Sequence, residues 1–196
     1  SSNGIMEGFA GADTLTSLNG ANATASYAHA GDTYLAGQGI TTAAGQGVTA
    51  NLTSPTGTAF ASGWSGAAAL AAGLGSAVTN TGDALGDTYT GNIYKLTGSA
   101  FDDILIGNAL ANTITSGAGN DLMEGLAGAD AFDGGAGIDT VSYAHSTLGV
   151  VADLGTSGTY VPSNDAVGDT FTNVENLIGT IYNDTLVGNS LDNVLN

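Results

Sequence analysis

The sequence predicts an all-β fold in which short parallel strands stack as a solenoid built from two homologous modules. Three observations carry this prediction. A nine-residue pattern repeats without a gap from Gly98 to Ser142, several longer stretches occur twice in the chain, and glycine accounts for 32 of the 196 residues. Because a fixed repeat period overrides local helix or strand propensity, the repeats decide the fold class.

The tandem repeat consists of five consecutive nonapeptides, which read GSAFDDILI, GNALANTIT, SGAGNDLME, GLAGADAFD and GGAGIDTVS. The eighth residue is apolar in every unit. Two further units occupy residues 179–196, and GFAGADTLT near the start follows the same pattern. An acidic residue or its amide stands at the sixth position of these units: Asp13, Asp103, Asn112, Asp121, Asp130, Asp139, Asp184 and Asn193.

The spacing within each unit predicts a tight turn followed by a three-residue strand. Glycines at the first positions permit positive φ angles, so the backbone can turn sharply and direct its carbonyl groups toward one point. The carboxylate follows within two residues, and the middle side chain of the strand points into the solenoid. The glycines to which we assign this role are Gly117, Gly119, Gly128, Gly135 and Gly137.

Stacked turns bring the acidic residues together. Two nonapeptides complete one turn of 18 residues, so we expect Asp103, Asp121 and Asp139 to stack on one edge and Asn112 beside Asp130 on the other. Carboxylates only a strand spacing of ~4.8 Å apart repel one another unless cations lie between them. Main-chain carbonyls with a carboxylate form the oxygen cage that calcium prefers. We therefore predict calcium as the cofactor of these turns.

The unit GGAGIDTVS matches in full the pattern G-G-x-G-x-D-x-U-x of the RTX calcium-binding nonapeptide, and the other units resemble it. The resemblance implies a right-handed parallel β-roll with calcium between successive turns. It also implies a secreted protein at the cell surface or outside the cell, commonly exported by a type I system. Asn112 and Asn193 depart from the pattern, so we expect those units to bind calcium more weakly or merely to continue the solenoid.

Longer internal similarities divide the chain into two modules, residues 1–97 and 98–196. The tetrapeptide SYAH occurs at 26–29 and 142–145, and GDTYTGN at 86–92 resembles GDTFTNV at 168–174. The first module carries additional loops at 35–46 and 53–84. Within the second loop, the apolar segment 64–78 forms either a short helix packed on the roll or an interface. Alternating apolar residues in GVTANL and GVVADL, residues 47–52 and 149–154, predict further strands.

Composition and motif spacing argue against several classes of function. A net charge of −17, with Lys95 as the one basic residue, makes nucleic acid an improbable partner. Cysteine is absent, which excludes disulfides and thiolate metal sites, and no apolar run is long enough for insertion into a membrane. His29 and His145 lie in the duplicated SYAH, where a packing role is more plausible than catalysis, so we expect no enzyme.

A structural or adhesive surface protein is therefore the leading interpretation. The last unit ends in frame at Asn196, and the first residues continue the repeat where the last unit stops. We expect copies to stack head to tail into a fibre or matrix, with the strand around Val194 and Leu195 added to the one around Ile5 and Met6. Cell-surface components are a further expected partner. Two alternatives remain open: a segment of a large adhesin or S-layer protein, and an accessory module of an exported enzyme.

Overall fold

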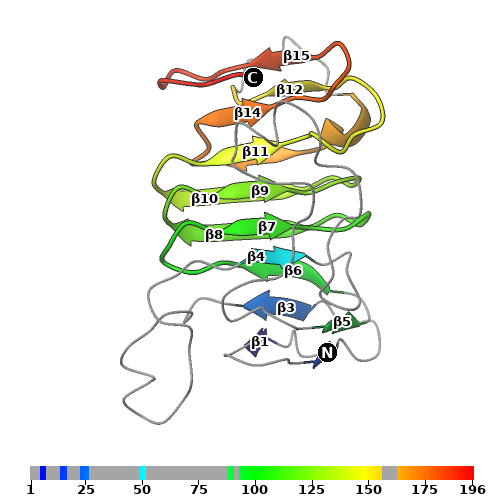
Figure 1. Ribbon diagram of the computed structural model, residues 1–196, viewed down its shortest axis with the longest axis vertical. Coiled ribbons are helices and arrows are strands. Elements are labelled where there is room, and N and C mark those ends of the chain that lie inside the picture. The colour runs from blue at the N-terminus through cyan, green and yellow to red at the C-terminus, as the bar shows by residue number, and fades with distance from the viewer. Residues whose placement is uncertain are drawn as a thin grey trace.

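The computed structural model describes five short strands between residues 5 and 90 and the ranges 93–155 and 163–196 (Figure 1). Nearly all regular structure in these parts is strand, which confirms the all-β class. Their one helix is the 3-10 turn η2 (Asn164–Ala166), and none is long and apolar enough to cross a membrane. The strands are β1 Ile5–Glu7, β2 Thr14–Thr16, β3 Ala23–Ser26, β4 Thr49–Asn51, β5 Thr88–Thr90, β6 Ile93–Thr97, β7 Ile104–Ile106, β8 Thr113–Ala118, β9 Leu122–Glu124, β10 Ala131–Ala136, β11 Thr140–Ser142, β12 Val151–Asp153, β13 Thr170–Thr172, β14 Asn176–Ile178 and β15 Thr185–Val187.

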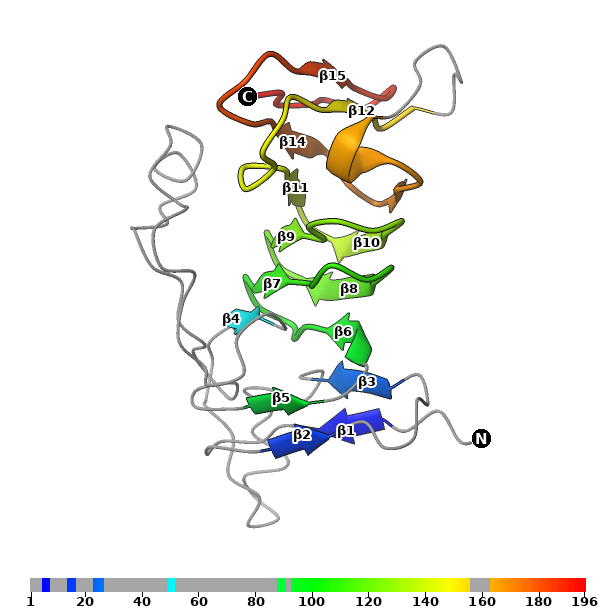
Figure 2. The same ribbon diagram turned by 90° about the vertical axis from the view of Figure 1, so that its right-hand side faces the viewer.

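Two parallel sheets form the body of the molecule. One has the order β1-β3-β6-β8-β10-β13 and the other β14-β11-β9-β7-β4, and Figure 2 shows them as two layers. From β6 to β11 the chain alternates between the layers, so each pair of nonapeptides makes one rung. Ile104 pairs with Leu122 and Thr113 with Ala131. Both offsets equal the 18 residues that the repeat predicts.

The apolar core lies between the two sheets. It contains the eighth residue of every tandem unit, and none of these five side chains is more than 2% exposed: Leu105, Ile114, Met123, Phe132 and Val141. Side chains alternate across a strand, so the middle residue of a three-residue strand faces this core while its neighbours point to the opposite face of the sheet. On the five-stranded sheet that opposite face carries a second buried apolar cluster of Ile106, Leu122 and Ile178. The Phe132 ring stacks on that of Phe171 with centroids 5.8 Å apart. The predicted inward position is confirmed.

The 18-residue register breaks after β11. Strand β13 pairs with β10 at an offset of 39 residues, and β14 pairs with β11 at an offset of 36. The intervening excursion carries η2 and β12, and β12 pairs with β15 in a sheet of two strands. Val150, Ala152 and Leu154 are buried, as their alternation predicts.

Several sequence predictions lie outside the described residues: Asp13, His29, and the additional loops 35–46 and 53–84 with the apolar segment 64–78. Strand β4 occurs within GVTANL as expected. Strand β6 pairs with β3 on one side and with β8 on the other, so one sheet runs across the predicted boundary at residues 97 and 98. The β-roll and the two-module organisation stay predictions.

Candidate metal centre

The sixth residue of each tandem unit is buried although it is acidic or polar. Asp103, Asn112, Asp121, Asp130 and Asp139 are at most 2% exposed, and each directly precedes a strand. One oxygen of each later side chain accepts a hydrogen bond from the main chain of the preceding rung. The Asp103 N–H donates to Asp121 Oδ1 (2.8 Å), the Asp121 N–H to Asp139 Oδ1 (2.9 Å) and the Asn112 N–H to Asp130 Oδ1 (2.7 Å). The structure thus brings these residues together in the two predicted files.

Each file continues onto an acid that the sequence analysis missed. The Asp130 N–H donates to Asp169 Oδ1 (2.8 Å), and the Asp139 N–H donates to Glu175 Oε2 (2.9 Å). Asp169 lies 39 residues after Asp130, which is no multiple of 18, and Glu175 lies 36 residues after Asp139, so comparing residues one 18-residue turn apart passes over both acids. The available signal was local: both acids directly precede a three-residue strand, β13 or β14.

The second carboxylate oxygen distinguishes three of these residues from the others. Oδ2 of Asp121, Asp130 and Asp139 is buried and accepts no hydrogen bond within the described part of the chain. A buried oxygen without a partner is costly, and more so when it carries charge. Burial raises the pKa of Asp130 and Asp139 to about 7 and also raises that of Asp121. A cation beside these oxygens would favour the ionised form.

The three loops that end in these residues, 116–121, 125–130 and 134–139, are called the open loops below. All are left-handed at their second and fourth positions: Gly117 (φ 115°), Gly119 (138°), Leu126 (72°), Gly128 (147°), Gly135 (82°) and Gly137 (147°). The five predicted glycines therefore have the positive φ expected of them, and Leu126 adopts it without being glycine. A Cβ at Gly137 would overlap the Gly119 carbonyl oxygen, so loops on one edge stack too closely for a side chain.

Four other units form closed loops, at 98–103, 107–112, 179–184 and 188–193, in which the sixth residue is held by its own loop. The Ser99 N–H donates to Asp103 Oδ2 (2.6 Å) and the Ser99 hydroxyl to Oδ1 (2.8 Å). Thr180 makes the same two bonds to Asp184, at 2.7 and 2.9 Å. In the remaining loops, the second-position N–H donates to the amide oxygen of Asn112 (2.8 Å) or Asn193 (2.9 Å).

The first-position glycine has a role that sequence reasoning assigned only to backbone turning. A Cβ at Gly125 would overlap Asp130 Oδ2, so the carboxylate lies directly against this glycine. The signal was present, since a residue with no side chain precedes the acid by five positions in most units.

The donor set fits calcium only with main-chain participation. In the ranges that the structure describes, no three Asp, Glu, His or Cys side chains converge as a metal site. An ion would therefore be held by one or two carboxylates, from Asp121, Asp130 and Asp139, together with carbonyl oxygens of the stacked loops. Hard oxygen ligands of this kind suit calcium, which tolerates irregular cages of six to eight oxygens.

His145, a candidate base that the sequence analysis set aside, is buried against a carboxylate. The ring nitrogen Nδ1 of His145 lies 2.6 Å from Glu124 Oε2, and the main-chain N–H of His145 donates to Glu124 Oε1 (3.1 Å). Burial raises the pKa of Glu124, while the hydrogen bonds from His145 oppose that rise. The neighbouring Tyr143 donates its hydroxyl to Asp169 Oδ2 (2.7 Å). Both side chains of the second SYAH thus tie the excursion to the stacked sheets.

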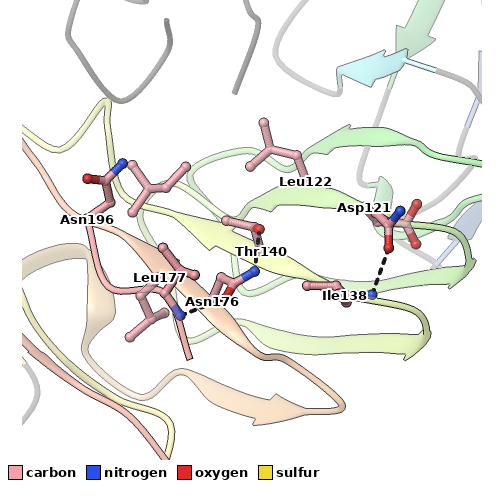
Figure 3. A pocket seen from close by; sticks show the side chains of 10 residues that line it. Asp121, Leu122, Ile138, Thr140, Asn176, Leu177 and Asn196 are labelled. Carbon is pink, nitrogen blue, oxygen red and sulfur yellow. Dashed lines mark hydrogen bonds between the residues drawn. The ribbon is translucent and has the colours of Figure 1, made fainter. Parts of the chain in front are cut away.

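A hollow of about 310 Å³ lies beside β9, β11 and β14 near the C-terminal strand (Figure 3). Asn120 and Asn176 line it, and their side-chain oxygens accept main-chain hydrogen bonds from Ile138 (3.0 Å) and Val194 (2.8 Å). Asp121 is the one ionisable residue of the lining. The hollow therefore offers no acid and base pair.

Comparison with known families identifies residues 106–141 as four copies of the RTX calcium-binding nonapeptide repeat. The matched range contains all three open loops and the closed loop at Asn112. No curated protein matches the chain. RTX nonapeptide repeats bind calcium, which confirms the predicted cofactor, and they are typical of extracellular proteins exported by type I secretion.

Proposed function

We propose that this chain is a secreted, non-enzymatic structural protein of the cell surface or extracellular matrix, folded by calcium and joined head to tail through its terminal strands. Export by a type I system is part of the proposal, because RTX repeats are typical of proteins that are secreted in this way. The observation that carries the assembly is a strand edge at residues 194–196, which pairs with β14 on one side and with no other strand among the described residues on the other.

Residues 194–196 extend the five-stranded sheet by pairing with β14. The Leu177 N–H donates to the Val194 carbonyl (3.1 Å), the Asn196 N–H to the Leu177 carbonyl (3.0 Å) and the Gly179 N–H to the Asn196 carbonyl (2.8 Å). Alternate residues of a parallel strand present their N–H and C=O groups to opposite sides. The N–H and C=O of Leu195 therefore point away from β14, where another strand can pair with them.

Exposed apolar side chains are frequent in the part of the chain that leads to this edge. Of the nine large hydrophobic side chains that are exposed in the described residues, five lie between 181 and 195. Val194 is 63% and Leu191 58% exposed. Apolar side chains gathered beside an open strand favour a protein partner over a small solute. At the other end of the stack, β1 is the outermost strand of the six-stranded sheet (Figure 1). Residues 194–196 extend the other sheet, so joining the two terminal strands requires each copy to be rotated about the stack axis relative to the one before it.

A non-enzymatic role is supported by how the acids are used. Asp121, Asp139 and Glu175 accept main-chain hydrogen bonds from the preceding rung. These acids therefore join successive rungs of the stack. His145 is engaged with Glu124. The chemistry that remains available, buried carboxylate oxygens at the open loops, is that of a metal site.

The assembly is tested by Leu195→Pro, which removes the outward N–H and leaves the hydrogen bonds to β14 in place, because an edge strand accepts proline on its free side. Leu195→Ala keeps that N–H and is the matched control. In millimolar calcium, sedimentation and electron microscopy should show fibres for the unaltered chain and the alanine variant, and folded single copies for the proline variant.

Discrete single copies of the unaltered chain in calcium would overturn the fibre and leave the two alternatives, a segment of an adhesin or S-layer protein or a module of an exported enzyme. Circular dichroism of each variant establishes that it is folded before its assembly is compared.

A further inference from the structure

We infer that the described nonapeptide loops are of two kinds: the open loops take calcium, whereas the closed loops hold their own acid or amide and need no ion. The inference rests on calcium binding by the repeats and deepens it by assigning the ions to particular loops. The residues at the second and fourth positions determine the kind of loop.

The second position decides where its N–H points. In the closed loops it is Ser99, Asn108, Thr180 or Asn189, whose N–H donates to the sixth side chain. Its side-chain oxygen also accepts the N–H two residues later, as in Phe101 N–H to Ser99 Oγ (3.2 Å) and Tyr182 N–H to Thr180 Oγ1 (2.9 Å). Such side-chain turns are a common habit of Ser, Thr and Asn.

In the open loops the second residue has positive φ, and no hydrogen bond joins its N–H to the sixth carboxylate. The left-handed conformation turns the N–H away, so it does not reach Oδ2 of Asp121, Asp130 or Asp139. The Ser116 hydroxyl lies near Asp121, but it donates its one hydrogen to the Gly134 carbonyl (2.8 Å). The same three side chains are at most 2% exposed, so water does not replace the missing donor easily. A buried, unpaired carboxylate oxygen is the feature that calls for a cation.

The fourth position separates the two kinds in sequence. It is apolar in every closed loop, as Phe101, Leu110, Tyr182 or Leu191, and glycine in every open loop, as Gly119, Gly128 or Gly137. The glycines have φ between 138° and 147°, a region that L side chains rarely adopt. An apolar side chain at this position therefore excludes the open conformation.

The identity of the sixth residue supports the assignment independently. Closed loops accept either Asp or Asn, since Asn112 and Asn193 receive the same main-chain hydrogen bond as Asp103 and Asp184. Every open loop has Asp. A site that needs only a hydrogen-bond acceptor tolerates the amide, whereas a site that holds a cation with few side-chain ligands favours the carboxylate, because its charge offsets that of the ion. Asn112 and Asn193 thus belong to closed loops and are not weakened calcium sites.

The test uses one substitution at two matched places. Asp103 and Asp121 occupy the same edge on adjacent rungs, and each is 2% exposed. We expect Asp103→Asn to leave the number of bound calcium ions and their Kd within about twofold of the unaltered chain. Asp121→Asn should lose bound calcium or weaken it by about tenfold or more. Equilibrium dialysis measures the ions, and circular dichroism in calcium measures folding.

Asp184→Asn and Asp139→Asn form a second pair with the same expectation. Loss of calcium in Asp103→Asn or Asp184→Asn would overturn the inference, and so would full calcium binding by Asp121→Asn and Asp139→Asn. If the open-loop variants fail to fold, the closed-loop variants still test the inference, because loss of calcium from either of them contradicts it. If the unaltered chain binds no calcium, both this inference and the proposed calcium-driven folding are wrong. If the unaltered chain binds calcium but open-loop and closed-loop variants lose it equally, only the division into two kinds of loop is wrong.

Discussion

The open and closed loops place the same buried acid at the same point of a rung and complete it in different ways. Asp103 and Asp121 lie one above the other and are equally buried. Two donors from Ser99 satisfy the first, while Oδ2 of the second has no donor. A buried acid in a solenoid turn can therefore be satisfied by hydrogen bonds from its own loop or by a bound ion.

The difference concentrates calcium dependence in residues 116–142. A hydrogen bond to a charged group contributes about 1.5–3 kcal/mol, and a buried polar group left unpaired costs about 1–3 kcal/mol. Three consecutive open loops thus carry a deficit that the closed loops on either side of them do not. The glycines of the open loops add to this deficit, because they lose more backbone entropy on folding.

Removing calcium should have the largest effect on this comparison. An ion present at about 1,000 times its Kd stabilises the folded state by roughly 4 kcal/mol per site, and that stabilisation disappears in chelator. We expect the β-signal in circular dichroism to fall, with amide exchange increasing first in residues 116–142 and later in the closed loops. A full β-spectrum with an unchanged Tm in excess chelator would contradict this. Magnesium, which demands a small octahedral shell, should restore little.

Gly137→Ala should have the next largest effect. The added Cβ would overlap the Gly119 carbonyl, and φ of 147° is unfavourable for alanine, so we expect a loss of about 1–3 kcal/mol in the free energy of unfolding. Leu191→Ala changes the equivalent position of a closed loop, where the side chain is 58% exposed, and should cost less than about 0.5 kcal/mol. Urea unfolding in saturating calcium compares them, and equal losses would remove the distinction between the loops.

Acid should weaken calcium binding at the open loops. The pKa of Asp130 and Asp139 is raised to about 7 by burial in the folded state, so open loops that stay folded without calcium hold protons there that the unfolded chain releases near pH 4. These raised pKa values contribute stability that is complete below about pH 4 and is lost as the pH rises through 7. Calcium must displace the protons, so its affinity should fall about tenfold per pH unit below 7 for each proton displaced. Titration calorimetry at pH 6, 7 and 8 measures this, and a constant affinity would refute it.

Thr180→Ala should have the smallest effect and should act on stability alone. It removes the hydroxyl that donates to Asp184 Oδ1, so we expect a loss of about 1 kcal/mol with no change in calcium affinity. Thr180→Ser keeps the hydroxyl and should restore the stability. A weaker calcium affinity in the alanine variant alone would place an ion at this closed loop.

The repeat period alone was enough to predict the stack. Nine-residue units predict three-residue strands, an inward eighth residue and an 18-residue register, and Leu105, Met123 and Val141 obey all three. In the other layer the predicted strand length is wrong, because β8 and β10 continue into the next loop and have six residues each. These features were accessible because they depend on near neighbours: the alternation of side chains along a strand and the tolerance of glycine for positive φ. The choice of calcium followed from the same residues.

The tertiary structure decided what the period could not reach. Asp169 and Glu175 join the two files only because the excursion after β11 returns the chain to the stack, 39 residues after Asp130 and two 18-residue turns after Asp139. The division into open and closed loops depends on where one N–H points, and this separates Asp103 from Asp121 although their repeat positions are identical. A repeat pattern shows which residue types recur at each position. Which donor hydrogen-bonds to each buried oxygen depends on the backbone conformation of its loop and on the rung packed against it, so only the tertiary structure could decide it.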